Sequence, residues 1–313
     1  MVTLSVIIPV YKAENSIKKC VQSVLTSKSV TEVILINDGS PDNSLEVCNE
    51  LRKNEPRVKV FTQENCGPAV ARERGVSLAV SDYVTFVDSD DFVTEGAYDD
   101  VLEYADGVDI LEFGWQKTDA DGNVISKSEL YHETVTGDDC ILHYAKQKNT
   151  ANYLCNKIFS RNIIADIKWE RLFCGEDAYV LCHCFFDASN YRVIPHVLYN
   201  YVMTENSLSR GITSKAFDNI RAYHLISNLC EQRRVELVPY AQYKLCSVSA
   251  NLYCASENKE QQELLKNEFE KARSRISLRF ILKNGSLHRK LLVILFGVSP
   301  NLCRFLIRNR RGE

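Results

Sequence analysis

The sequence predicts an α/β fold with a mostly parallel central sheet, followed by a helical extension. Apolar, β-branched runs alternate with amphipathic helical patterns in the first third of the chain, and these runs cover residues 4–10, 32–36, 58–62 and 83–87. Strands that alternate with helices form parallel sheets through right-handed crossovers. Runs that are apolar throughout indicate strands covered by helices on both faces.

Three helical patterns separate these runs. The first, residues 17–25, follows Asn15, and the second, residues 45–51, follows Ser44, so we expect these two polar residues to be N-caps. The third pattern opens at Gly67-Pro68, and proline is favoured in the first turn of a helix.

The fourth run ends in three carboxylates, at Asp88, Asp90 and Asp91. If the extended conformation persists through this segment, Asp88 and Asp90 project to the same side. Oxygen ligands placed in this way suit a divalent cation that also holds substrate phosphates. The alternative is an Asx-rich turn that caps a helix starting at Thr94.

A second polar turn, Asn37-Asp38-Gly39, follows the second run. Ligands of open α/β sheets bind at the carboxyl ends of the strands, so we expect both turns to lie at one ligand-binding edge. Arg72 belongs to the third helical pattern, close to the same edge. The alternative for an isolated arginine is a solvated surface position.

The motifs of this region resemble glycosyltransferase family 2. The first two thirds of the chain carry the set in order, and its members are Ser5-Val6-Ile7-Ile8-Pro9-Val10-Tyr11, Asn37-Asp38-Gly39-Ser40, Gly67 to Gly75, Val87 to Asp91, Asn156-Lys157-Ile158-Phe159, Gly175-Glu176-Asp177, Tyr199-Asn200-Tyr201 and Asn206-Ser207-Leu208-Ser209. The resemblance covers about residues 3–210. Glu73-Arg74 departs from the family pattern, which commonly has Asn after the arginine.

The resemblance implies a GT-A fold and transfer of a sugar from a nucleotide diphosphate sugar, most often a UDP-sugar, with inversion. The implied reaction is a metal-assisted direct displacement by a saccharide or a polyprenyl-diphosphate-linked saccharide. It also implies a role in bacterial surface polysaccharide biosynthesis, such as that of capsule, exopolysaccharide or O-antigen.

The resemblance also implies the roles of single residues. By matched position, the expected nucleotide-binding residues are Pro9, Tyr11, Asp38, Arg72, Asp88 and Ser89. Asp90 is the expected direct ligand of Mn²⁺ or Mg²⁺, and Asp88 is shared between the ribose and the metal. Such a cation would act as a Lewis acid on the departing diphosphate.

An inverting displacement needs a base that takes the proton of the acceptor hydroxyl. By match to the family, Asp177 is this base and Glu176 supports the acceptor. Both precede an apolar helical pattern at residues 179–186, so the alternative is that they are favourable acids of a helix's first turn.

Other enzyme classes fit the sequence less well. No Gly-x-Gly-x-x-Gly follows the first run and no phosphate loop ends in Gly-Lys-Ser/Thr. A phosphatase with an Asp-x-Asp site would have that site after its first strand, whereas Asp88 follows the fourth run. A sugar-nucleotide-binding module without catalysis stays an alternative.

Charge and cysteine content restrict the function class and the cellular compartment that the sequence fits. The 38 Lys and Arg against 41 Asp and Glu argue against a general nucleic-acid binder. The 12 cysteines are scattered, with no Cys-x-x-Cys pair, and no secretory signal precedes the first run. We therefore expect a reduced, cytoplasmic protein.

Two domains are expected. Residues 1–212 form the catalytic domain, with a nucleotide-binding half of about 1–115 and an acceptor half of about 116–212, and residues 213–313 form a helical extension. The apolar run 291–298 is too short to cross a bilayer, which takes about twenty apolar residues.

The end of the extension predicts a membrane contact. Leu302, Phe305 and Leu306 share one side of a basic terminal helix, which favours an amphipathic anchor on an anionic membrane surface. This anchor would place the protein on the inner face of the cell membrane. The alternative is a terminal helix packed on the catalytic domain, and the oligomeric state is not predicted.

Overall fold

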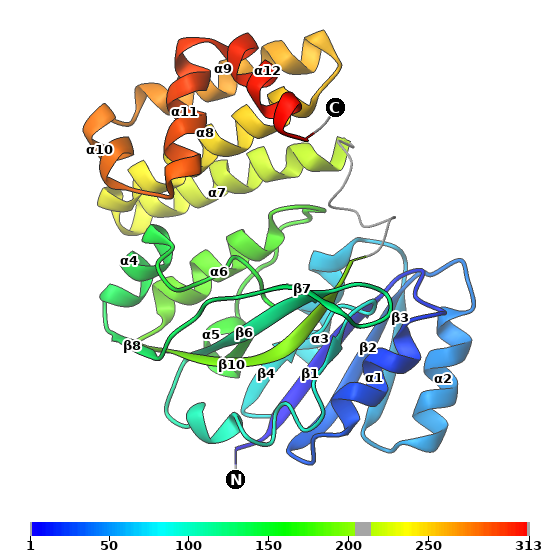
Figure 1. Ribbon diagram of the computed structural model, residues 1–313. Helices are drawn as coiled ribbons and strands as arrows, with labels where there is room; N and C mark the ends of the chain where they lie inside the picture. The colour runs from blue at the N-terminus through cyan, green and yellow to red at the C-terminus, as the bar shows by residue number, and fades with distance from the viewer. Residues whose placement is uncertain (1, 204–213, 312–313) are drawn as a thin grey trace. The chain divides into compact units, whose positions relative to one another are not determined.

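The computed structural model describes residues 2–203 and 214–311 (Figure 1). The Asn206–Ser209 motif therefore lies outside the described residues. Within them, the strands form one ten-stranded sheet with the spatial order β3-β2-β1-β4-β9-β6-β10-β5, while β7 pairs with β6 and β8 with β10. The strands are β1 (Leu4–Val10), β2 (Val30–Asp38), β3 (Val58–Gln63), β4 (Tyr83–Phe86), β5 (Phe92–Val93), β6 (Ile110–Thr118), β7 (Val124–Lys127), β8 (Glu133–Thr136), β9 (Lys157–Ser160) and β10 (Asn190–Val202).

Helices flank this sheet and make up the last third of the chain. Their bounds are α1 (Ile17–Leu25), α2 (Ser44–Asn54), α3 (Pro68–Leu78), α4 (Asp139–Lys146), α5 (Arg161–Ile164), α6 (Glu176–Asp187), α7 (Asp218–Arg233), α8 (Val238–Ala255), α9 (Lys259–Ser274), α10 (Leu278–Lys283), α11 (Leu287–Val298) and α12 (Pro300–Arg311).

The predicted α/β fold is confirmed, and its first four strands are the predicted ones. β1 is parallel to both β2 and β4, and β2 is parallel to β3. Ile7 of β1 lies opposite Ile34 and Phe86, and all three are fully buried. Because these strands run in one direction and in register, their carboxyl ends meet at the same edge. Beyond β4 the sheet is mixed, since β9 runs antiparallel to β4 and β6.

Close packing brings α3 against β1. A Cβ built on Gly75 would come within 2.3 Å of the Ile7 side chain, so only glycine fits at this contact. The buried Ala69 and Ala71 are equally small. Small residues on this face let the helix approach the sheet, with its N-terminus, at Pro68, near the strand ends.

Two local expectations are wrong. No helix starts at Thr94; β5 precedes it, turns follow it, and the next helical segment is the short 3₁₀ turn Leu102–Tyr104. The residues that precede α1 and α2 are Ser16 and Asn43, each one position away from the expected cap, and neither side chain caps its helix.

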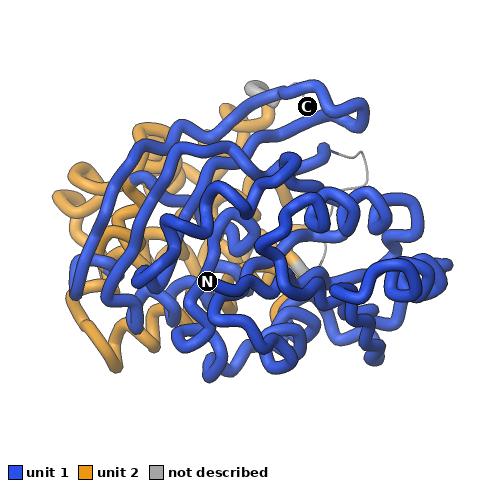
Figure 2. Tube along the Cα trace, turned by 90° about the horizontal axis from the view of Figure 1, so that it is seen from below, with its two compact units in different colours: residues 1–141, 149–171, 176–209 blue, residues 142–148, 172–175, 210–313 orange. Residues whose placement is uncertain are grey.

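The chain divides into two compact units, drawn in two colours in Figure 2. Unit 1 comprises residues 1–141, 149–171 and 176–209, and unit 2 comprises 142–148, 172–175 and 210–313. Two short segments that were expected in the acceptor half therefore group with the helical unit. In unit 2, Phe296 of α11 packs against Tyr253 and Phe269. Among the described helices, none combines the length and apolar character that crossing a membrane requires.

Candidate active site

The candidate site forms in unit 1, at the edge where the parallel strands end. β1 leads into Tyr11, which is 45% exposed, β2 ends in the buried Asp38, and β4 leads into the turn Asp88–Asp91. Pro9, near the end of β1, is half-buried. The three predicted strand ends therefore come together, as the register of β1, β2 and β4 requires.

Asp38 organises the turn that leads into α3. Its Oδ1 accepts hydrogen bonds from Gln63 Nε2 at 2.8 Å and from the Cys66 N–H at 2.9 Å, and its Oδ2 accepts one from the Gly67 N–H at 2.8 Å. Gly67 has a φ of 88°, a left-handed conformation that glycine adopts without steric cost. Since a carboxylate offers about four acceptor positions, these three donors leave one of them unused.

The acidic segment is a turn and is not extended, because the Asp91 N–H donates to the Asp88 carbonyl at 3.0 Å. The condition under which Asp88 and Asp90 were expected to project together is therefore not met. Asp91 points inward, and its carboxylate accepts hydrogen bonds from the Tyr199 hydroxyl at 2.5 Å and the Val202 N–H at 2.8 Å. Burial, and then the charges of Asp88 and Asp90, raise the pKa of Asp91 to about 8. Asp91 thus anchors the turn.

Arg72 lies at the centre of the site, in contrast to the surface position that an isolated arginine favours. Its side chain is buried, and its guanidinium donates to Asp88 Oδ1 at 2.7 Å and to Glu176 Oε1 at 3.0 Å. Asp177 Oδ1 lies 3.6 Å from the same guanidinium. One arginine from α3 therefore joins the acidic turn to the start of α6. Asp88 and Glu176, 88 residues apart in sequence, become neighbours only in the fold.

Asp177 carries a carboxylate with a raised pKa. Burial raises its pKa to about 7; Arg72 opposes this shift, while Glu176 and Asp88 add to it. Its Oδ2 accepts a hydrogen bond from the Leu154 N–H at 3.2 Å. Its buried Oδ1 has no hydrogen-bond donor among the described residues. An acceptor group with a pKa near the operating pH suits proton removal from a hydroxyl.

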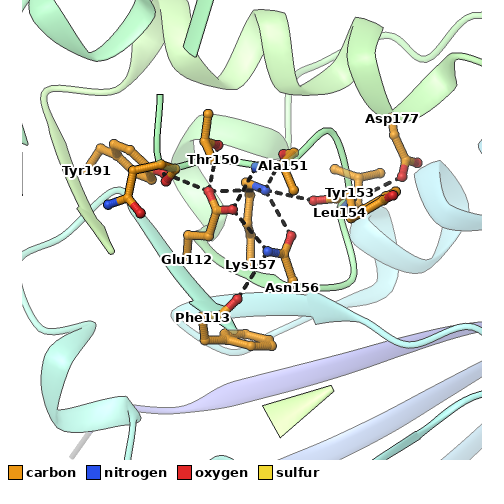
Figure 3. A network of polar contacts seen from close by, with 11 residues as sticks. Glu112, Phe113, Thr150, Ala151, Tyr153, Leu154, Asn156, Lys157, Asp177 and Tyr191 are labelled. Atoms are coloured by element: carbon orange, nitrogen blue, oxygen red, sulfur yellow. Dashed lines mark hydrogen bonds and ion pairs between the residues drawn. The ribbon is translucent and has the colours of Figure 1, made fainter. Parts of the chain in front are cut away.

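A buried ion pair holds the segment that carries Leu154 (Figure 3). Lys157 and Glu112 are fully buried, with Nζ and Oε2 3.3 Å apart. The ammonium donates to the carbonyls of Ala151, at 2.7 Å, and Tyr153, at 2.9 Å. Both backbone carbonyls are thus fixed from inside the protein, and the Leu154 N–H is fixed with them.

Glu112 accepts four further hydrogen bonds of this network. Its carboxylate accepts from the Tyr191 hydroxyl at 2.6 Å, the Thr150 hydroxyl at 2.7 Å, the Ala151 N–H at 2.9 Å and Asn156 Nδ2 at 3.0 Å. A buried charge with this many donors is stabilised without solvent. We therefore call residues 149–156 the base-side loop, since it contacts Asp177 and is held by this network.

The acidic turn can contribute to a cation site but does not form one alone. Asp88 uses Oδ1 for Arg72, and Asp90 is exposed and has no ion-pair partner within residues 2–203 and 214–311. The described residues contain no cluster of three or more potential metal ligands. One or two carboxylates completed by substrate phosphates is the usual arrangement for Mg²⁺, so the donor set fits a cation that arrives with a diphosphate. Ser89 is half-buried between the two aspartates.

Sequence reasoning missed Glu112, the structural role of Asp91 and the contacts of Lys157. A signal for the ion pair was present, because Glu112 follows Ile110 and Leu111 in the apolar start of β6 and Lys157 opens β9 directly before Ile158 and Phe159. A charge inside a buried strand needs a partner.

Comparison with known proteins finds a matching family model, curated relatives and a solved structure. The family model described as "Glycosyl transferase family 2" matches residues 5–168, slightly more than half of the chain. "Uncharacterized glycosyltransferase YibD" of Escherichia coli is 31% identical over 217 residues, which are 66% of this chain and 63% of the relative. "Minor teichoic acid biosynthesis protein GgaB" of Bacillus subtilis is 26% identical over 238 residues, which are 71% of this chain and 25% of the relative.

The fold also matches a solved structure. The Staphylococcus aureus protein TarS, residues 1–349 in complex with UDP-GlcNAc, superposes with a TM-score of 0.74 at 20% identity, over 99% of this chain and 92% of that one. The chain therefore has the GT-A-like fold of TarS, and it spans less than two thirds of the length of YibD and GgaB.

Proposed function

This chain belongs to glycosyltransferase family 2, and on that premise we propose that it transfers a sugar from a UDP-sugar to a saccharide or lipid-linked saccharide with inversion. The observation that carries the proposal is the cluster around Arg72, in which Asp88 of the acidic turn and Asp177 at the start of α6 share one guanidinium. An Asp-x-Asp phosphatase is excluded by the family assignment.

In the proposed reaction the chain's own residues bind the donor and move one proton. Asp38 would accept the imide N–H of uracil beside Pro9 and Tyr11, and Arg72 would approach the diphosphate. Asp177 would take the proton of the acceptor hydroxyl through its Oδ1, which has no hydrogen-bond donor among the described residues. Glu176 would hold the acceptor. The three carboxylates are hydrogen-bond acceptors suited to N–H or O–H donors, and Arg72 is a cation suited to a diphosphate.

Asp90 and the second oxygen of Asp88 would hold Mn²⁺ or Mg²⁺. When bound, such a cation supplies charge neutralisation on the leaving diphosphate. The similarity to GgaB supports a place in bacterial surface polysaccharide biosynthesis.

The donor class can be tested with a panel of UDP-, GDP- and dTDP-sugars in the presence of Mn²⁺. We expect saturable binding and slow hydrolysis of at least one UDP-sugar, measured by titration calorimetry and release of UDP. Binding without hydrolysis or transfer would indicate a binding module, and the absence of binding to every sugar nucleotide would contradict the proposal.

We also propose that unit 2 lets the protein bind the cytoplasmic face of an anionic membrane. Residues 271–312, which we call the acid-free segment, contain 11 Lys and Arg and no Asp or Glu, whereas residues 1–270 contain 27 Lys and Arg and 40 Asp and Glu. Large apolar side chains of the segment are exposed, and they are Leu278, Leu282, Leu287, Leu291, Val298, Leu302, Phe305 and Leu306. This combination is typical of helices that lie in a membrane interface.

The structure changes which residues can carry this contact. Arg304 and Arg308 belong to the basic terminal helix that was expected at the membrane surface, but both form ion pairs with Glu257. The side chains of Arg310 and Arg311 lie outside the described residues. α11 also buries Leu292, Val293 and Phe296, so removal of the segment would uncover part of the core of unit 2. Point substitutions are therefore a better test than truncation.

The triple variant Leu282→Gln, Leu287→Gln, Leu291→Gln is expected to lose binding to vesicles that contain phosphatidylglycerol, while the wild type binds them and is released by salt. Each basic side chain near the anionic surface adds on the order of 1 kcal/mol, and salt screens it. Flotation measures the bound fraction.

Val80→Gln is the matched control for this variant, because Val80 is 72% exposed in unit 1. It should float like the wild type. A wild-type protein that ignores anionic vesicles, or a triple variant that binds them equally well, would show that the exposed leucines serve another purpose.

A further inference from the structure

Two aromatic side chains meet beside Asp177. Tyr153 of the base-side loop is 42% exposed, and its ring lies 5.5 Å from the ring of Trp115 at an interplanar angle of 90°. Trp115 belongs to β6 and is partly buried against the core. Edge-to-face packing holds the two rings in a defined arrangement and leaves part of the Tyr153 ring open to solvent.

Each member of the pair is linked to one part of the candidate site. Tyr153 directly precedes Leu154, whose N–H donates to Asp177. Burial, and then neighbouring groups that include Asp177, raise the pKa of the Tyr153 hydroxyl. On the other side, Trp115 pairs in register with Tyr199, the residue that donates to Asp91 and accepts from the Asp88 N–H. The aromatic pair is therefore adjacent to both the base and the acidic turn.

The position of Tyr153 is set before any ligand binds. Lys157, fully buried, donates to the Tyr153 carbonyl at 2.9 Å, and Glu112 accepts from the Ala151 N–H at 2.9 Å (Figure 3). A site whose support is already in place loses less conformational entropy on binding.

A pyranose ring has the chemistry that this pair accepts. Its C–H groups form an apolar face, and its hydroxyls project from the edge, so the ring combines apolar contact with hydrogen bonding as an aromatic platform beside a polar group requires. The buried Oδ1 of Asp177, which has no hydrogen-bond donor within residues 2–203 and 214–311, is the polar group.

We propose that Trp115 and Tyr153 form the acceptor subsite, on which a pyranose residue of the acceptor stacks so that one hydroxyl reaches Asp177. This inference rests on the proposed sugar transfer and adds where the acceptor binds. Tyr153 gives the exposed contact and Trp115 sets its orientation. The base-side loop acts as the positioning element.

The tryptophan content makes a direct test possible. The chain has two tryptophans, and the second, Trp169, is buried against Phe86 with ring centroids 5.8 Å apart. A Trp169→Phe variant therefore reports Trp115 emission alone. Methyl β-glucopyranoside, methyl β-galactopyranoside and methyl β-N-acetylglucosaminide are the probes, titrated in the presence of UDP and Mn²⁺.

We expect at least one glycoside to change Trp115 emission saturably. In the same background, Tyr153→Ala should raise the glycoside concentration needed for half saturation about tenfold, and Tyr153→Phe should restore it because the ring is retained. If no glycoside changes the emission, or if Tyr153→Ala binds as well as the parent, the subsite is wrong.

Measurements with the donor distinguish a failure of the acceptor subsite from a failure of the proposed sugar transfer. UDP-sugar binding should be unchanged in Tyr153→Ala, since the substitution leaves Asp38, Arg72 and the acidic turn in place. A raised donor KM would assign Tyr153 to the donor and overturn the acceptor subsite. Failure of the parent protein to bind any sugar nucleotide would instead refute the proposed transfer itself.

Discussion

Asp177→Asn is expected to lower the rate of sugar transfer by about 10²- to 10⁴-fold, the usual contribution of a positioned general base. The amide keeps the shape of the side chain but cannot accept the proton. Donor binding should be nearly unchanged, because Asp177 lies at the start of α6 and is not among the residues proposed to hold the nucleotide. Single-turnover transfer and UDP-sugar titration measure the two effects.

The pH dependence provides an independent check on this base. The pKa of Asp177 is raised to about 7, so the ionised form that can accept a proton is lost as the pH falls through 7. The transfer rate of the wild type should therefore fall below pH 7, and this limb should be absent in Asp177→Asn. A variant with near-normal rates would move the base role elsewhere, first to Glu176.

Asp90→Ala is expected to abolish metal-dependent UDP binding and transfer, because loss of a cation at the diphosphate removes several kcal/mol of transition-state stabilisation. Asp90 is exposed and forms no ion pair within the described residues, so its removal should leave the turn folded. Calorimetry with UDP, with and without Mn²⁺, measures the change.

Glu95→Ala is the matched control, since Glu95 is an exposed acid a few residues further along the chain. It should bind UDP and Mn²⁺ like the wild type. Equal affinity and turnover in Asp90→Ala and the wild type would refute the proposed role of Asp90 as a metal ligand.

The parallel part of the fold could be predicted because each signal is local. Runs such as 4–10 and 83–87 are mostly apolar, and Gly67-Pro68 marks the start of the next helix, so each element can be recognised without its neighbours. The parallel arrangement then places Asp38 and Asp88 at one edge. The false helix at Thr94 shows the limit, since a favourable cap cannot form a helix where β5 precedes it and turns follow it.

The internal arrangement of the site could not be predicted in the same way. Nothing in the run Asp88–Asp91 indicates that Asp91 turns inward, because its partners, Tyr199 and Val202, are more than a hundred residues away. The burial of Arg72 depends equally on Glu176. Such contacts depend on tertiary packing, which local propensity does not encode.

The ion pair of Glu112 and Lys157 restricts which substitutions this protein tolerates. Removing one partner of a buried pair leaves an uncompensated charge and typically costs about 3–5 kcal/mol, whereas replacing both by apolar residues of similar volume is often neutral. In this network an apolar pair would leave the Tyr191 and Thr150 hydroxyls without their acceptor, so a random library selected for folding should retain the two charges together. Single replacements would be depleted at each position, so the pair acts as one unit of selection.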